Sequence, residues 1–252
     1  MEKKLVLIDG HSILNRAFYG VPDLTNSAGL HTNAVYGFLN IMFKILEEEN
    51  PTNLAVAFDV KQPTFRHIMY AEYKGTRKPM PEELREQVPL IKEVLQAMNI
   101  RIVELPGYEA DDVLGTLAKR GEKENMSVSV ITGDRDLLQL ATDKILIRIP
   151  KTKKGTTEVE NYYDKQVEEK YQVTPIEFID VKALMGDTAD NIPGVPSVGE
   201  KTATSLIVQY HSVENLYKHI DEITKKKLKE NLENNKDKAF MSCLLYTSDA
   251  AD

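Results

Sequence analysis

Lys4–Ser12, with the sequence KLVLIDGHS, decides the fold class, because an apolar, strand-like run ends directly in an acid, Asp9. Asp59 after AVAF and Asp134 after VITG repeat this design. Five apolar, β-branched runs predict strands, and most are separated by longer stretches with helical spacing: KLVLID, NLAVAFD, IRIVELP, VSVIT and ILIRI. Strands that alternate with helices predict an α/β fold with a mainly parallel sheet.

The acids that end these strands are expected to share one edge of the sheet. The strand runs are apolar almost throughout, as in parallel sheets that are covered on both faces. Ligands of open α/β sheets bind outside the carboxyl ends of the strands. Acids that are distant in sequence are therefore predicted to lie together there.

After about Asn161 the pattern changes to short helices, expected at 165–172, 175–185, 200–210 and 213–220. The stretch GDTADNIPGVPSVG, between the second and third of these, is rich in turn-forming residues and predicts a loop. The sequence thus predicts a core over 1–162, with an insertion at about 61–106, and a helical region over 163–242.

Composition sets limits on the class of protein. The chain has 252 residues and one cysteine, Cys243, which excludes an internal disulfide and fits a reducing cytoplasm. No apolar run approaches the roughly 20 residues of a membrane helix, so no membrane partner is expected. The net charge is -7, but the acids of the short motifs carry more negative charge than this, so the rest of the chain is mildly basic. The charge therefore does not exclude nucleic acid.

Acids concentrate in four motif regions, LIDGHS, AFD, YEADD with ITGDRD, and MGDTADN. The candidate metal ligands are Asp9, Asp59, Glu109, Asp111, Asp112, Asp134, Asp136, Asp187 and Asp190. Hard cations such as Mg²⁺ prefer oxygen ligands, and phosphodiester hydrolysis commonly uses two such ions about 3.5–4 Å apart. The motifs contain no cysteine and only one histidine, His11, so zinc is disfavoured. Each acid alone could instead cap a helix or shape a turn.

A basic and aromatic window opens the insertion, KQPTFRHIMYAEYKGTRKP. Its cations suit phosphates and its rings suit stacking on single-stranded bases. The candidate DNA-binding residues here are Arg66, Tyr73 and Lys78, and the candidate catalytic cations are Lys74 and Arg77. Lys74 and Arg77 would share one face of a helical turn. The alternative is a solvated loop whose aromatic residues pack on the core.

A glycine hairpin, GVPSVGEKTA, precedes the helix expected at 200–210. Its backbone N–H groups could approach a phosphate at the helix N-terminus, and would then read duplex DNA by shape. The candidate DNA-binding residues are Gly194, Val195, Val198, Gly199 and Lys201. The alternative is a glycine-rich turn between two helices.

Together the motifs resemble those of the bacterial 5′-nuclease domain in the flap endonuclease superfamily. LIDGHS, AFD, FRH, YKGTRKPMP, GYEADDVLGTLA, ITGDRDLLQL and LMGDTADNIPGVPSVGEKTA occur in that family's order, from about Lys4 to Ser242. The resemblance implies a PIN-like α/β core, a helical-arch insertion and a C-terminal helix–three-turn–helix DNA-binding region. It also implies a monomeric, cytoplasmic enzyme of the bacterial nucleoid that cleaves 5′ flaps and 5′ ends of duplex DNA in replication and repair.

The resemblance further assigns roles. It implies one Mg²⁺ site at Asp9, Asp59, Glu109 and Asp111, and a second that draws on Asp134, Asp136, Asp187 and Asp190, with Asp112 nearby; Mn²⁺ could replace Mg²⁺. It implies that Tyr73, Lys74 and Arg77 steer the 5′ strand and the scissile phosphate. The hairpin would hold duplex DNA and a K⁺ ion, and a polymerase domain could follow in the full-length protein.

Residues 243–252, CLLYTSDAAD, depart from the family's pattern. We therefore expect a non-native or disordered tail that packs on nothing. Two other functions stay open at this point: a PIN-type ribonuclease, and a non-catalytic module that binds DNA junctions.

Overall fold

The computed structural model describes residues 3–153 and 156–248, and the chain divides into two compact units. The first unit comprises residues 3–64 and 79–163, and the second comprises 65–78 and 164–248. Residues 65–78, expected in an insertion of the core, thus group with the second unit. The rest of the expected insertion supplies regular helices and a strand to the first unit.

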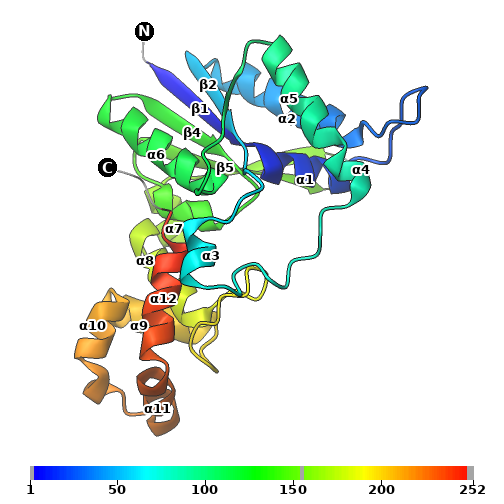
Figure 1. The fold of residues 1–252 in the computed structure, drawn as a ribbon. Coiled ribbons are helices and arrows are strands. Elements are labelled where there is room, and N and C mark those ends of the chain that lie inside the picture. The colour runs from blue at the N-terminus through cyan, green and yellow to red at the C-terminus, as the bar shows by residue number, and fades with distance from the viewer. Residues whose placement is uncertain (1–2, 154–155, 249–252) are drawn as a thin grey trace. The chain divides into compact units, whose positions relative to one another are not determined.

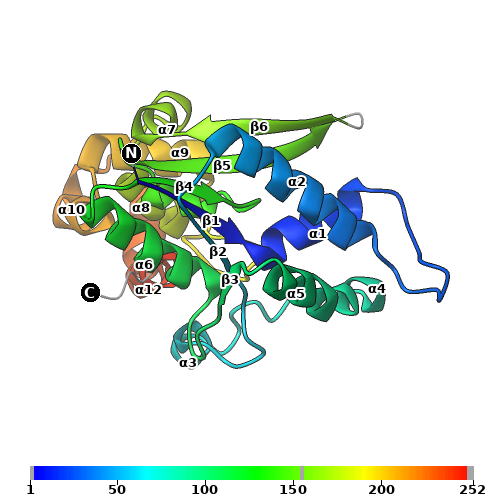
Figure 2. The ribbon, with the colours of Figure 1, turned by 90° about the horizontal axis from the view of Figure 1, so that it is seen from above.

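In the first unit, six strands form one sheet in the order β3-β2-β1-β4-β5-β6. Neighbours from β3 to β5 are parallel, and β6 is antiparallel to β5 at one edge of the sheet (Figure 2). The bounds are β1 Lys4–Asp9, β2 Asn53–Ala57, β3 Arg101–Val103, β4 Ser127–Ile131, β5 Ile145–Lys153 and β6 Thr156–Tyr162. The expected mainly parallel α/β core is confirmed, and β6 is an additional strand.

Helices cover both faces of this sheet. Helices α2 and α5 lie on one face and α6 lies on the other (Figure 1). The bounds in this unit are α1 Gly10–Gly20, α2 Asn33–Glu49, α4 Glu82–Arg85, α5 Gln87–Ala97, α6 Ala110–Lys123 and the 3-10 helix η1 Asp136–Leu140. Two covered faces explain why the strand runs are apolar almost throughout.

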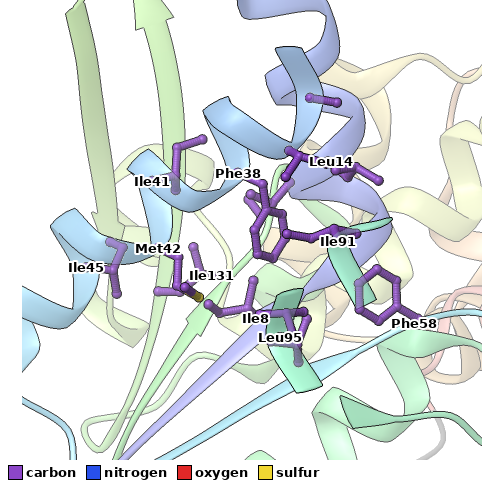
Figure 3. Packing of buried hydrophobic residues seen from close by; sticks show 14 of the residues in the cluster. Ile8, Leu14, Phe38, Ile41, Met42, Ile45, Phe58, Ile91, Leu95 and Ile131 are labelled. Carbon is purple, nitrogen blue, oxygen red and sulfur yellow. The ribbon is translucent and has the colours of Figure 1, made fainter. Parts of the chain in front are cut away.

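The main hydrophobic core lies between the sheet and the face that carries α2 and α5. Figure 3 shows Ile8 of β1 and Ile131 of β4 facing side chains from these helices. On α2, the buried residues Phe38, Ile41, Met42 and Ile45 follow the spacing of an amphipathic helix. This packing fixes the strands whose carboxyl ends carry the acids.

The second unit is helical. Its elements are α3 Phe65–Met69, α7 Asp164–Tyr171, α8 Pro175–Met185, α9 Glu200–Tyr210, α10 Val213–Lys218, the 3-10 helix η2 Ile220–Glu222, α11 Lys226–Asn234 and α12 Lys236–Tyr246. Helix α8 packs against α9 and α12. Thr174 and Glu177 form a capping box, and Pro175 occupies the first helical position. Helices α8 and α9 have the bounds expected from the sequence, and the capping box explains where α8 begins.

The expectation of a tail that packs on nothing is wrong for residues 243–248. Residues Cys243–Tyr246 form the last turn of α12, and Leu245 and Tyr246 are buried. The buried guanidinium of Arg66 donates hydrogen bonds to the carbonyl oxygens of Leu245 (2.8 Å) and Thr247 (2.8 Å). Leu245 and Tyr246 belong to a hydrophobic cluster of the second unit that also contains Ala183. Residues 249–252 lie outside the described part of the chain.

Among the residues that the structure describes, no helix is long and apolar enough to cross a membrane.

Candidate functional site

Asp9 is the buried carboxylate at the end of β1. Its Oδ1 accepts a hydrogen bond from the Ser12 N–H (3.0 Å) and caps α1, and its Oδ2 accepts one from the Thr132 hydroxyl (2.9 Å). Burial raises the pKa of Asp9 to about 6, and the charges of Asp59 and Asp134 add to that rise against the two hydrogen bonds. The three carboxylates therefore act on one another, as expected for acids at one sheet edge.

Asp59 connects the end of β2 to the start of α6. Its Oδ1 accepts a hydrogen bond from the Ala110 N–H (2.8 Å), and its own N–H donates to His11 Nδ1 (3.1 Å). His11 Nδ1 also lies 3.3 Å from Asp59 Oδ2. Because Ala110 follows Glu109 directly, the structure brings the AFD and YEADD motifs together.

The two other acids at the start of α6 differ in their surroundings. Asp112 is 1% exposed, and its Oδ2 accepts a hydrogen bond from the Glu109 N–H (2.9 Å). Asp111 is half-buried in the first helical turn. The structure thus gives Asp112 a capping role, which was the alternative to metal binding for an acid at this position.

Asp134 lies in the turn that follows β4, and Asp136 is the first residue of η1. The Asp134 N–H donates to the Thr132 hydroxyl oxygen (3.0 Å), and the Asp136 N–H donates to Asp134 Oδ1 (2.8 Å). The Thr132 hydroxyl therefore links Asp134 to Asp9, since it also donates to Asp9 Oδ2. Both acids are half-buried, so their carboxylates can still meet a cation or solvent.

The donor set of the first unit fits a hard cation. Over residues 3–153 and 156–248, no three or more His, Cys, Asp or Glu side chains already stand close enough to hold a metal ion. Three of the carboxylates are nevertheless close enough to repel one another, because the charges of Asp59 and Asp134 both raise the pKa of Asp9. A divalent cation would relieve this repulsion, and carboxylates are the ligands that Mg²⁺ prefers.

The remaining acids, Asp187 and Asp190, belong to the second unit, where each has a basic partner. Burial alone would raise the pKa of Asp187, but the Lys182 ammonium (3.0 Å) and nearby backbone N–H groups hold it below its usual value. Asp190 is buried, and its Oδ1 accepts hydrogen bonds from Arg77 Nε (2.8 Å) and Nη2. In this structure, therefore, a predicted metal ligand and a predicted catalytic cation pair with each other.

Two residues of the basic and aromatic window, Arg66 and Tyr73, are buried. Arg66, predicted to bind DNA, is 2% exposed and is used within the fold, because its guanidinium binds carbonyl oxygens at the end of α12. Tyr73 is buried in a cluster with Ala183 and Ile192, so its ring is not free to stack on a base. Both findings favour the alternative that these side chains pack within the fold.

Three basic residues of this window, Lys74, Arg77 and Lys78, are at least partly exposed. Lys74 has a left-handed backbone (φ 56°), and its Nζ lies 5.0 Å from the centroid of the Tyr73 ring. The Arg77 N–H donates to the Lys74 carbonyl oxygen (3.0 Å) in a turn, so the expected helical turn is absent at this point. Lys78 is exposed.

The hairpin uses its two glycines differently. Gly194 is buried at φ 57°, and a Cβ there would lie 2.4 Å from the Gly186 backbone nitrogen. Gly199 is exposed, has an ordinary φ of -95° as the N-cap of α9, and a Cβ there would meet nothing within 4 Å. Val195 and Val198 are buried and anchor the loop. Close packing of two backbones thus explains Gly194, whereas Gly199 and the exposed Lys201 remain open to a ligand.

Several polar residues around Asp9 were not among the predicted site residues. Ser12 and Thr132 hold Asp9 and the neighbouring turn, since the Ser12 hydroxyl oxygen accepts from the Gly133 N–H (2.8 Å). Arg16 of α1 lies beside Gly133 and has a buried Nε with no hydrogen-bond partner among the described residues. Ser12 and Thr132 stand inside the quoted motifs, so the signal was present, whereas nothing local in the sequence distinguishes Arg16.

Comparison with known families covers nearly the whole chain. Residues 4–172 match the model of the 5′-3′ exonuclease N-terminal resolvase-like domain, and residues 173–250 match that of the 5′-3′ exonuclease C-terminal SAM fold. These matches define the class as a 5′-nuclease enzyme. The chain belongs to the 5′-3′ exonuclease family.

Among curated proteins, similar relatives include DNA polymerase I of Bacillus subtilis, 56% identical over 97% of this chain, and that of Geobacillus stearothermophilus, 53% identical over 96%. The chain spans only 28% and 27% of the length of these relatives.

Among solved structures, the T5 D15 protein co-crystallized with metal ions has a TM-score of 0.79 at 23% identity, with 98% of this chain and 90% of that chain covered. The catalytic core of Rad2 in complex with DNA substrate has a TM-score of 0.63 at 16% identity, with 100% and 80% covered. At these identities the two structures show a shared fold.

Proposed function

We propose that this protein is a structure-specific 5′-nuclease that hydrolyses DNA at 5′ flaps and at 5′ ends of duplexes, including RNA-primer ends, in bacterial replication and repair. The observation that carries the proposal is the convergence of Asp9, Asp59 and Asp134 at the carboxyl edge of a parallel sheet, with the start of α6 held beside Asp59. Solved structures of the same fold were crystallized with metal ions and with DNA, which agrees with it.

The metal-binding residues that we propose for the first unit are Asp9, Asp59, Glu109, Asp111, Asp134 and Asp136. Mg²⁺ ions, with Mn²⁺ as a substitute, would supply charge stabilisation and an activated water. The chain's own contribution is orientation, because Ser12 and Thr132 fix both oxygens of Asp9, and Ala110 fixes one oxygen of Asp59. The assignment of Asp187 and Asp190 to a second ion stays a prediction from the resemblance.

For the second unit we propose two DNA-binding elements. Lys74, Arg77 and Lys78 would meet the strand that is cut, and the backbone at Gly199 with Lys201 would hold duplex DNA, with K⁺ as a further ligand of the hairpin. Exposure supports the second element, because Gly199 and Lys201 are exposed and a Cβ at Gly199 would meet nothing within 4 Å. A polymerase domain in the same polypeptide is a proposal that agrees with the length of the relatives.

The decisive variant is Asp134→Asn with Asp136→Asn. We expect cleavage of a 5′-flap substrate in Mg²⁺ to be lost while junction binding in Ca²⁺ persists, because the carboxylates hold ions rather than DNA. The matched control is Glu93→Gln with Asp143→Asn, which removes the same charge from exposed positions of the same unit and should cleave normally. Near-normal turnover of the first variant in Mg²⁺ would overturn the proposed metal site.

The same assay separates the alternatives. Wild-type protein is incubated with a 5′-flap DNA, a blunt duplex and a single-stranded RNA, each with Mg²⁺ or EDTA. A structure-specific nuclease cuts the flap and the duplex end only in Mg²⁺. Preferential cleavage of the RNA would indicate a ribonuclease, and binding without cleavage of any substrate would indicate a junction-binding module.

A further inference from the structure

A group of side chains on and beside the edge strand β6 holds the segment Asp134–Asp136, which carries two of the proposed metal ligands. Arg135 Nη2 donates a hydrogen bond to Glu160 Oε2 (2.9 Å), and its Nη1 donates to the Tyr162 hydroxyl oxygen (3.4 Å). The Tyr162 hydroxyl donates to the same Glu160 oxygen (2.9 Å), and Lys151 Nζ donates to Glu160 Oε1 (2.6 Å). The Glu160 carboxylate therefore accepts hydrogen bonds at both of its oxygens.

Arg135 stands between two proposed metal ligands in the sequence. It is the N-cap of η1 with an αR backbone, and the Asp136 N–H donates back to Asp134 Oδ1 (2.8 Å). A guanidinium that starts between two carboxylates can reach either of them, and arginine binds carboxylates with two donors at once. The second unit shows such a contact, because Arg77 donates to Asp190 from two nitrogens. Without another carboxylate to bind, Arg135 would therefore compete with a metal ion for its own neighbours.

Positive charge is concentrated around Glu160. Arg135 and Lys151 both form ion pairs with it. Arg16 of α1 is close enough to be affected by both signs of charge, because burial and the charge of Arg135 lower its pKa while the charge of Glu160 opposes that fall. One carboxylate thus faces three cations in the part of the fold where the acids should bind divalent ions.

Stability alone does not account for this arrangement. The side chains of Arg135 and Glu160 are 36% and 29% exposed, and ion pairs at such exposure contribute little to the stability of a fold. Strand β6 is already held by backbone pairing with β5 along its whole length. What the ion pair determines is the place of the Arg135 guanidinium.

We propose that Glu160 is a positioning residue that keeps the Arg135 guanidinium away from the carboxylates of Asp134 and Asp136, and so leaves them available to divalent cations. The inference rests on the proposed function and deepens it, because it adds to the metal site a carboxylate that binds no metal. Tyr162 completes the contact, since its hydroxyl meets both Arg135 and Glu160. Loss of the Glu160 charge releases the guanidinium to its neighbours in sequence, where a metal ion has to displace it.

The test measures Mn²⁺ binding by isothermal titration calorimetry on the protein without DNA. Glu160→Gln should raise the half-saturating Mn²⁺ concentration about tenfold, the size of effect that residues behind metal ligands commonly have. Arg135→Gln with Glu160→Gln should return it close to the wild-type value, because the competing cation is gone. Lys151→Gln with Glu160→Gln changes the net charge equally but keeps Arg135, so it should bind as weakly as Glu160→Gln. The control Glu158→Gln, at an exposed position of the same strand, should bind as wild type does.

Thermal unfolding of each variant shows whether it is folded. Tyr162→Phe provides a second, milder variant, because it removes one hydroxyl and keeps the ring. It should weaken Mn²⁺ binding in the same direction as Glu160→Gln and by less. Unchanged Mn²⁺ binding in both folded variants would overturn the inference.

Equal recovery in the two double variants would also overturn it, because a general effect of charge would then explain the result. Mn²⁺ binding that Asp134→Asn with Asp136→Asn removes and Glu160→Gln leaves intact would uphold the proposed metal site and refute only the role of Glu160. A wild-type protein that binds no Mn²⁺ would refute the proposed metal site and this role with it.

Discussion

The two glycines of the hairpin offer a sharp test, because the same residue type is required there for different reasons. At Gly194 a Cβ would lie 2.4 Å from the Gly186 nitrogen and 2.7 Å from the Gly186 Cα, so backbone atoms would have to move. The φ of 57° also disfavours any side chain. Gly194→Ala should therefore destabilise the fold itself.

The magnitude follows from these two terms. A left-handed backbone at a residue with a Cβ costs about 1–2 kcal/mol, and forced overpacking adds about 1–3 kcal/mol. Gly194→Ala should thus lower the free energy of unfolding by about 2–5 kcal/mol. At about 2–4 °C for each kcal/mol in a chain of this size, the thermal midpoint should fall by roughly 10 °C.

Gly199→Val should give the opposite pair of results. Its Cβ meets nothing within 4 Å and its φ is ordinary, so only the loss of a favourable N-cap residue, about 0.5–1 kcal/mol, is expected. Duplex binding should weaken by about tenfold or more, equally for unrelated sequences, because side-chain bulk displaces a phosphate without loss of a base contact.

The assays are thermal unfolding and anisotropy with two duplexes of unrelated sequence. Normal duplex binding by Gly199→Val, or loss for one sequence only, would refute the assignment of this end of the hairpin to DNA. An unchanged midpoint in Gly194→Ala would refute the packing argument.

Three further predictions follow from single features of the structure. Arg77→Ala should slow single-turnover cleavage at saturating enzyme by roughly 10²-fold with a much smaller loss of junction affinity, because a cation placed at the phosphate stabilises the transition state; rate and affinity lost in equal proportion would contradict this. Truncation after Ser242 should lower the thermal midpoint clearly, since it removes the buried Leu245 and Tyr246, each worth about 1.5–3 kcal/mol, and an unchanged midpoint would show that these contacts contribute nothing. Burial raises the pKa of Asp180 from 3.8 to about 6, so its neutral form is favoured by folding and this stability, complete below pH 3.8, is lost as the pH rises through 6. Asp180→Asn should therefore be more stable than wild type at pH 7.5 by on the order of 1–3 kcal/mol, after discounting for partial exposure, and should match it near pH 4 in urea titrations; equal stability at both pH values would contradict the assignment.

The fold was predictable where one local signal was strong enough to act alone. Apolar runs that end in acids located β1, β2 and β4, and the capping box of Thr174 located the start of α8. Strand β6, with the sequence TTEVENY, was missed because it is an antiparallel edge strand with few apolar residues. Its pairing with β5 depends on register and not on its own composition.

The candidate site was predictable in part, for a related physical reason. The acids at strand ends converge because the topology requires it, and the structure shows their mutual effect on the pKa of Asp9. The burial of Arg66 and Tyr73 could not be predicted, because a basic or aromatic residue type does not reveal burial. Arg66 donates a hydrogen bond to the carbonyl oxygen of Leu245, which is 179 residues away, and no local sequence pattern predicts a contact at that distance.

The hydrogen-bonded ion pair of Arg77 with Asp190 connects a predicted catalytic cation with a predicted metal ligand. Asp190 is buried, so removal of the guanidinium leaves an unpaired carboxylate that costs stability as well as any catalytic contribution. A slow Arg77→Ala enzyme is therefore ambiguous unless the partner charge is removed as well. Asp190→Asn with Arg77→Ala restores neutrality at this contact. The difference in unfolding free energy between Arg77→Ala and this double variant therefore measures the cost of the unpaired carboxylate. Only the rate defect that persists in Arg77→Ala at a temperature well below its own thermal midpoint belongs to the cation. The ion pair thus determines how the catalytic experiment must be read, because one contact carries both the stability of the loop and the position of the arginine.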